Sequence, residues 1–500
     1  MFKNILANWV EILLSIASVF VLYPFLVGTI GEDQYGVWLL IVSITGYFQL
    51  LSLGVPLSTV RHISKYLANK EYDKVNEVIG SCLVLYSAIA LLVLVAGSAV
   101  ALWIDVLFEI PPEYHQVAKV AGLIAMSTVA LSFVFEVCEG VTHGCQKFVE
   151  LAAVKSGLLF MRVALTLVLV RHDNGLLVIS LLLGGVTVLQ GVLLFAHTRW
   201  KFPEIRFSFR KGSFAMTKEI LHYSVWALLL SLAGLISFKT DPIVIGSVLS
   251  VGRIVYFGIG NNFLLYLSDF IRGISRALMP AASSLEARDE TSALAKVYVD
   301  YSRLTYLILL PVCVLFVLIG GDFIAIWMGE DFRGPSGSVL TILAISYQFY
   351  LVQRGVGVSI MMGISRLRVP TMMMIQAAVV NAGLSVVLAA SWGADLDIDG
   401  VAWGTTIPNW ILTVGLIGYT AKQLHVRVWH YIVQSHLIPS LGIPLLVVPT
   451  LLVKQVMDID SYPKFAIAVV AALAVYSFGA YFLVGEYHRN MIRKRLLRRR

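Results

Sequence analysis

Long apolar runs alternate with short polar connections along the whole chain. Many runs approach 20 residues, the length at which an α-helix crosses a hydrocarbon layer of roughly 30 Å. Breaks at charged clusters, proline and glycine divide the pattern into about fourteen helices. Their predicted cores are 8–30, 36–57, 76–104, 116–138, 150–170, 176–197, 222–248, 253–280, 302–328, 337–362, 369–391, 400–421, 437–456 and 464–485. The pattern therefore predicts an all-α integral membrane protein with about 14 transmembrane helices.

Composition supports this fold class. Apolar residue types make up 58% of the chain and charged types 14%, whereas soluble domains carry about 25% charged residues. The four cysteines stand in or beside apolar runs without CxxC or paired histidine spacing, so we expect no disulfide framework, metal site or cofactor. Glu11 interrupts the first run and no small-residue cleavage pattern follows it, which argues against a removed signal peptide.

Lysine and arginine concentrate in alternate connections and in the tail "HRNMIRKRLLRRR", whereas the acidic connections "GEDQ", "WIDVLFEIPPE" and "ADLDID" fall on the opposite side. Cytoplasmic connections of membrane proteins carry this excess of positive charge. Both termini are therefore predicted to be cytoplasmic. The net charge of +8 reflects this bias and requires no nucleic-acid partner.

Two similar patterns suggest that the chain consists of two halves. "GTIGEDQYGVW" and "GSVLSVGRIVYFG" each join two apolar runs, and a charged stretch follows the second run in both places. Repeated multi-helix units are the usual construction of secondary transporters. We expect an N-terminal lobe of six helices at 1–198, a basic cytoplasmic linker at 199–221, a pseudo-symmetric lobe of six helices at 222–421, and two extra helices with a basic tail at 422–500.

The stretch "YGVWLLIVSITGYFQLLSLGVPLSTVRHISKYLA" (Tyr35 to Ala68) resembles the second-helix signature of the Wzx-type O-antigen flippases. These are polysaccharide transporters of the multidrug/oligosaccharidyl-lipid/polysaccharide (MOP) exporter superfamily. "SFKTDPIVIGSVLSVGRIVYFGIG" resembles the seventh helix of that family. In the family a basic residue often follows this aspartate, whereas here Pro242 follows Asp241 and Lys239 precedes it by two positions. Side chains two positions apart do not face each other on a helix, so a local ion pair does not carry over.

The resemblance implies a V-shaped, two-lobed bundle of the MATE type in the bacterial inner membrane. It also implies an activity, the movement of an undecaprenyl-diphosphate-linked oligosaccharide to the outer leaflet by alternating access. Expected partners are this substrate, membrane lipids, and the polysaccharide polymerase and chain-length machinery. A multidrug or cation antiporter of the same superfamily is the alternative, and a membrane polysaccharide polymerase ranks last because the outer loops are short. The protein is expected not to be an enzyme.

Charged side chains at membrane depth face a bundle interior or a water-filled cavity, since lipid exposure costs roughly 2.5–3.5 kcal/mol each. In the predicted helix 253–280, Asn262, Asp269, Arg272 and Arg276 fall within an arc of about 80°. The stripe is interpreted as a cationic wall that meets a lipid diphosphate, because arginine binds phosphate oxygens in pairs. The alternative is that Arg276 extends to the interface and that Asp269 and Arg272 form a plain i,i+3 pair.

Three further arginines are candidates for substrate binding. Arg354 stands among small residues in "YLVQRGVGVSI", and Arg162 is central in "LLFMRVALTL" with no acid nearby in sequence. Arg61 ends the second predicted helix at the cytoplasmic mouth, where it either receives phosphate or follows the positive-inside pattern.

Four charged residues are candidates for ion coupling or ion pairing. Asp241 precedes Pro242 at a predicted kink, with Lys239 nearby, and Asp269 belongs to the polar stripe. Glu136, with Glu139, is expected to pair with basic loops at the inner end of its helix.

Overall fold

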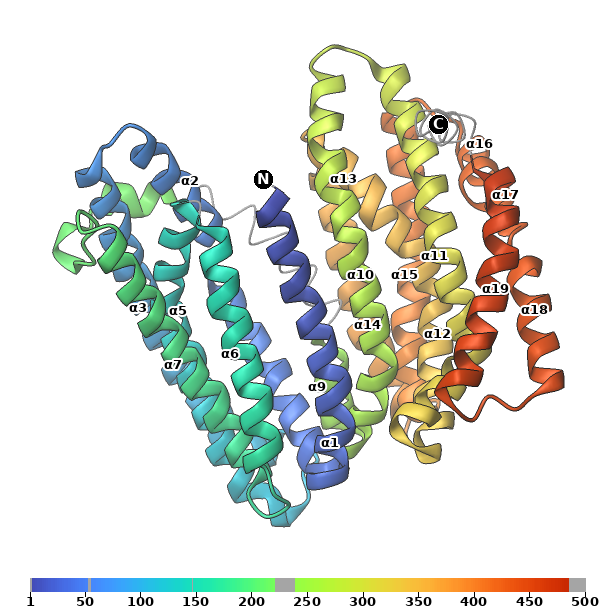
Figure 1. Cartoon of the computed structure of the whole chain (residues 1–500), viewed down its shortest axis with the longest axis horizontal. Helices are drawn as coiled ribbons and strands as arrows, with labels where there is room; N and C mark the ends of the chain where they lie inside the picture. Colours follow the sequence, from blue (N-terminus) through green and yellow to red (C-terminus); the bar gives the residue numbers. More distant parts are fainter. Residues whose placement is uncertain (1, 53–54, 146, 221–238, 485–500) are drawn as a thin grey trace. The chain divides into compact units, whose positions relative to one another are not determined.

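The computed structural model describes residues 2–52, 55–145, 147–220 and 239–484 of the 500. Within these ranges the side chains of 2–13, 55–58, 61, 68, 148 and 273–277 are outside the description. Every regular element in the described ranges is helical (Figure 1). The chain divides into two compact units, Met1–Val255 and Tyr256–Arg500.

The first unit contains α1 (Phe2–Gln49), η1 (Leu50–Ser52), α2 (Val55–Ala68), α3 (Tyr72–Leu102), α4 (Ile104–Leu107), η2 (Pro112–Tyr114), α5 (His115–Gly144), α6 (Phe148–Leu169), α7 (Gly175–Lys201), η3 (Phe209–Lys211) and α9 (Asp241–Val248). Helix α10 (Val251–Glu286) begins in the first unit and continues into the second.

The second unit continues with α11 (Thr291–Met328), η4 (Glu330–Phe332), α12 (Arg333–Val352), η5 (Gln353–Gly357), α13 (Val358–Gly363), α14 (Arg368–Ala389), α15 (Asp397–Gln423), α16 (Val428–Ile432), η6 (Val433–Leu437), α17 (Ile438–Ser440), α18 (Ile443–Val456) and α19 (Tyr462–Leu483).

Eleven helices in the described part are long and apolar enough to cross a membrane, so the predicted number of 14 is not confirmed. One of the eleven, Leu14–Ser52, covers most of both predicted helices 8–30 and 36–57, with a kink between them at Gly31. Gly31 has φ 78°, a backbone conformation that glycine adopts without steric cost. The predicted helix 222–248 falls largely outside the described residues.

Helix α15 coincides with the predicted helix 400–421 but is not one of the eleven. Thr405, Thr406 and Asn409 lower its mean hydropathy, and all three are buried inside the second unit. Since lipid tails are as apolar as leucine, helices in membranes associate through close packing and hydrogen bonds, for which such residues are suited.

The core of the first unit lies between α2, α3 and α5. Ile63, Ile79, Tyr86 and Phe133 are at most 1% exposed there. The rings of Tyr86 and Phe133 stack with their centroids 5.9 Å apart, which joins α3 to α5.

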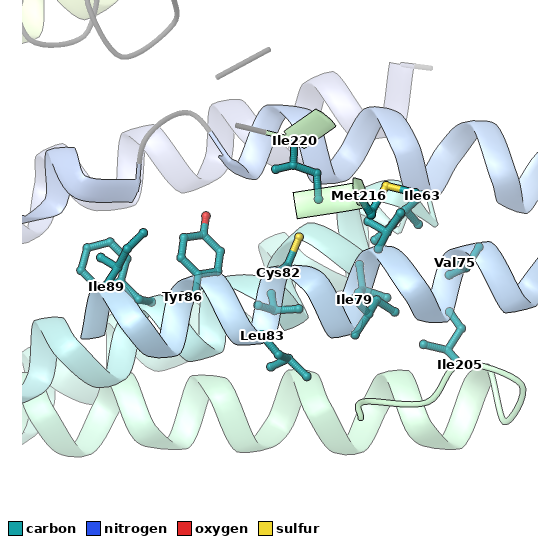
Figure 2. Packing of buried hydrophobic residues seen from close by; sticks show 14 of the residues in the cluster. Ile63, Val75, Ile79, Cys82, Leu83, Tyr86, Ile89, Ile205, Met216 and Ile220 are labelled. Carbon is teal, nitrogen blue, oxygen red and sulfur yellow. The ribbon is translucent and has the colours of Figure 1, made fainter. Parts of the chain in front are cut away.

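The residues after α7 pack against α3 as an additional part of this core. We call residues 202–220 the connecting segment. Its apolar side chains Ile205, Met216 and Ile220 join the same cluster (Figure 2). The side chain of Asn76 on α3 donates to the carbonyl of Glu204 and accepts from the backbone N–H of Arg206, at 3.1 and 2.6 Å. The connecting segment is therefore held along α3 by hydrogen bonds between the Asn76 side chain and the backbone of the segment, and by apolar packing.

In the second unit, α11 packs against α12, η6 and α18, and α14 packs against α15. Two π-helical turns, η5 after α12 and η6 after α16, both pack against α11. Such turns are rare and frequently mark functional sites.

Candidate functional site

The polar stripe of α10 is present as a helical face. One continuous helix carries Asn262, Asp269 and Arg272, so the spacing that predicted the stripe applies. Asp269 and Arg272 form an ion pair, with 49% and 62% of their side chains exposed. The i,i+3 pair considered from the sequence is therefore present. An ion pair this exposed contributes little to stability. Because most of the Arg272 side chain is exposed, its guanidinium is accessible to a second anion.

Two predicted phosphate ligands cannot be placed by their side chains. Arg276 lies on α10 and Arg61 on α2, but both side chains belong to the part outside the description. Their roles stay predictions.

Arg354 lies on the π-helical turn η5. The sequence shows small residues around Arg354, but they did not predict a π-helical turn there. Its guanidinium donates to the hydroxyl of Tyr350 at 2.7 Å and lies 5.9 Å from the centre of that ring. The side chain is half-buried. A π-turn widens the helix locally, and here it places a cation at membrane depth against an aromatic ring, a favourable arrangement.

Next to Arg354, Gln353 is fully buried and joins three helical segments. It accepts a hydrogen bond from Tyr298 of α11 at 3.1 Å and donates one to Tyr431 of α16 at 2.5 Å. The two tyrosine rings stack at 4.4 Å with an interplanar angle of 9°. This network fixes the turn that carries Arg354. This network was not predictable from the sequence, because the three residues are far apart in the chain.

Arg162 is half-buried on α6. At 1.5 Å per residue it lies about 5 Å from the midpoint of that helix. Among the described residues no acidic side chain forms an ion pair with it. A buried guanidinium without a counter-ion is costly, so this position suits an anionic ligand.

The structure separates Lys239 from Asp241. Asp241 begins α9 with Pro242 in its first turn, and its side chain is 2% exposed. The interruption predicted at this proline is therefore present as a helix start. The alkyl chain of Lys239 extends over Gly46 of α1, and the ion pairs of the described residues do not include Lys239.

Glu136 and Glu139 differ in their partners. Glu139 on α5 binds Lys155 of α6 at 2.5 Å, and His143 lies 3.6 Å away. The expectation that Glu139 pairs with basic loops is wrong, since Lys155 belongs to a membrane-spanning helix. Glu136, one turn earlier, has no ion pair among the described residues, and its Oε2 is buried without a hydrogen-bond partner there.

A cavity of about 300 Å³ lies between α10, α11, α12 and α19 in the second unit. Its walls are entirely apolar, and four phenylalanines contribute to them, Phe263, Phe316, Phe323 and Phe465. A cavity of this size and lining accommodates part of an aliphatic chain.

Comparison with known proteins then identifies the family. Residues 2–286, more than half of the chain, match the family described as polysaccharide biosynthesis protein. The chain belongs to this family. The match covers α1 to α10, including Arg162, Glu136 and the polar stripe of α10.

Two curated relatives of this family member are each 21% identical to it. The "Uncharacterized membrane protein EpsK" of Bacillus subtilis (strain 168) aligns over 500 residues, 98% of this chain and 97% of the relative. The "Putative O-antigen transporter" of Shigella flexneri aligns over 328 residues, 65% of this chain and 76% of the relative.

Two solved structures share the fold at 14% identity. The lipid II flippase MurJ in an inward closed conformation has a TM-score of 0.70, with 98% of this chain and 100% of that chain covered. An inward-facing MATE family multidrug transporter of the MOP superfamily has a TM-score of 0.66, with 82% and 94% covered. The predicted all-helical, MATE-like membrane fold is confirmed. The relatives whose names state a role are transporters or flippases, which agrees with the prediction that the protein is not an enzyme.

Proposed function

We propose that this protein moves an undecaprenyl-diphosphate-linked oligosaccharide, an O-antigen or exopolysaccharide repeat unit, from the cytoplasmic to the outer leaflet of the bacterial inner membrane. The family supports the polysaccharide pathway. The name of the Shigella flexneri relative supports an O-antigen substrate, and the fold of a lipid II flippase supports a lipid-linked one.

The observation that carries the proposal is Arg162. A half-buried cation near the middle of an apolar helix, with no acidic partner among the described residues, is stabilised when an anionic ligand binds. A diphosphate supplies that charge, and its oxygens match the planar guanidinium. Arg272 and Arg354 are proposed to contact the same group as the substrate moves, with Asn262, Arg276 and Arg61 as further polar contacts.

The mechanism we propose is alternating access between the predicted lobes, with both termini cytoplasmic and no bond made or broken in the substrate. The sugars would cross through a polar interior. The apolar cavity beside α19 would accept part of the polyprenyl chain, whose remainder stays in lipid. Four charged residues are proposed to couple transport to ions or to form ion pairs, namely Asp241, Lys239, Asp269 and Glu136. Polysaccharide polymerase and chain-length proteins are proposed to receive the product.

The second candidate, a multidrug antiporter, rests on the likeness to MATE transporters. Such proteins bind cations. Arg162 and Lys239 would repel a cationic substrate, and neither has an ion-pair partner among the described residues. An anionic substrate therefore fits the first unit better.

The test uses a bacterial strain lacking this protein and complemented with variants. Loss of the protein is expected to leave undecaprenyl-linked repeat units on the inner leaflet. Arg162→Ala, Arg272→Ala and Arg354→Ala are expected to cause the same accumulation, and Arg171→Ala, an exposed arginine just beyond α6, is the matched control. If the three variants insert stably and export repeat units fully, the proposal of a cationic binding surface is wrong.

A further inference from the structure

The two carboxyl groups at the end of α5 stand in unequal surroundings. Lys155 binds Glu139 at 2.5 Å, His143 adds a second nitrogen at 3.6 Å, and Gln190 of α7 donates to the other oxygen at 3.5 Å. Both Oε atoms of Glu139 therefore have partners. This set of partners is suited to an ionised carboxylate.

Glu136 has none of these partners. It lies on α5 about 12 Å before the end of the helix, within a membrane-spanning segment. Its Oε2 is buried with no hydrogen-bond partner among the described residues, and no described lysine, arginine or histidine forms an ion pair with it.

The polar group that faces Glu136 is the hydroxyl of Tyr86 on α3. The Tyr86 ring stacks on Phe133, which shares a helix face with Glu136 three residues later. The hydroxyl is itself buried without a hydrogen-bond partner among the described residues. Two orphaned polar groups thus face each other across the interface of α3 and α5.

We propose that Glu136 is a proton-binding site of the first unit. A carboxylate in this position would carry a negative charge next to that of Glu139 and without an ion pair among the described residues, since Lys155 acts on it only from a distance. Protonation removes that charge. One Oε gains an O–H bond to a proton that hydronium or a buffer acid in the surrounding water releases, and the donor loses its own bond to that proton. The neutral acid then offers both a donor and an acceptor to the Tyr86 hydroxyl.

The other titratable groups near this site have partners of their own. Cys82, one turn from Tyr86 on α3, contacts Thr59 at 3.1 Å. On α5 and α6, His143 and Lys155 are directed to Glu139. A proton can therefore bind at Glu136 without displacing the neighbouring side chains from their partners. This inference extends the proposed function, because binding and release of the proton would change the contact between α3 and α5.

Infrared difference spectroscopy on the full-length protein in lipid nanodiscs tests this inference without any substrate. At pH 7 the Glu136→Gln variant is expected to lose one C=O stretch of a protonated carboxylic acid, which shifts in D₂O. The matched variant Glu139→Gln is expected to lose carboxylate stretches instead. Raising the pH should remove the acid band of the wild type.

Loss of only carboxylate stretches in Glu136→Gln would overturn the proposal. Tyr86→Phe should shift the acid band, and an unshifted band would refute Tyr86 as its partner. Because the spectra need no transport, a negative result here leaves the flippase proposal standing, and failure of the export test leaves the proton site standing.

Discussion

Nζ of Lys155 on α6 lies 2.5 Å from Oε1 of Glu139 on α5, and both side chains are about one-quarter exposed. The pair joins two membrane-spanning helices through groups that would be costly to leave in lipid singly. The pair therefore affects stability less through the attraction between the two charges than through the free energy lost when one charge is left without its partner.

Replacing Lys155 with methionine should destabilise the first unit by about 2 kcal/mol, since it leaves Glu139 without its cation. The double variant Lys155→Met, Glu139→Gln should recover most of the loss, because no charge remains. Thermal unfolding of both variants and of Glu139→Gln in detergent gives the double-mutant cycle. Strictly additive effects would show that the two side chains are not coupled.

Replacing Gln353 with leucine should destabilise the second unit by roughly 1–3 kcal/mol, because the buried hydroxyls of Tyr298 and Tyr431 lose their shared partner. Chemical denaturation of the purified protein measures this loss. Gln116→Leu, at an exposed position of α5, serves as the control and should change stability little. An unchanged Gln353→Leu variant would mean that the network around η5 does not contribute to stability.

Adding a methyl group at Gly80 should loosen the connecting segment. A Cβ there would lie 2.5 Å from the backbone nitrogen of Gly212, so Gly80→Ala should cost about 1–3 kcal/mol and speed tryptic cleavage after Arg206 and Arg210. Gly185→Ala on α7, where a Cβ meets nothing within 4 Å, is the matched control. Equal cleavage rates in the two variants would contradict the docking of the segment on α3.

Acid should weaken the contact between α4 and α5. The hydrogen bond from Lys119, 2.7 Å away, holds the pKa of Asp105 below its usual range. The stability from this pair is present above the unfolded pKa of about 4 and is lost as the pH falls through the lower folded value. Lys119→Met should therefore lower the melting temperature at pH 7, with the difference from wild type shrinking in acid. Lys119→Arg should keep the melting temperature of the wild type at pH 7. If the difference between Lys119→Met and wild type widened in acid, the pair of Asp105 and Lys119 would not be its cause.

The fold class followed from the sequence because a lipid-spanning helix must satisfy all its backbone hydrogen bonds locally and expose apolar side chains. Both requirements leave a pattern within 20 neighbouring residues. The break between the first two predicted helices at Gly31 and the interruption at Pro242 were predictable for the same local reason. The number of helices stays a prediction, because one long helical span joins two predicted helices and the predicted helix 222–248 falls largely outside the described residues.

The candidate site divides in the same way. The sequence alone showed which cations stand in apolar helices, including Arg162, Arg272 and Arg354, because a charged residue inside a long apolar run can be recognised from its neighbours in the chain. Their partners became known only from the three-dimensional packing. Lys155 neutralises Glu139 and leaves Glu136 alone among the described residues, Gln353 joins two distant tyrosines, and the connecting segment packs on α3. Pairing depends on which helix faces meet. The residues joined by these contacts are 16 to 130 positions apart in the chain, so the local pattern carries no record of them.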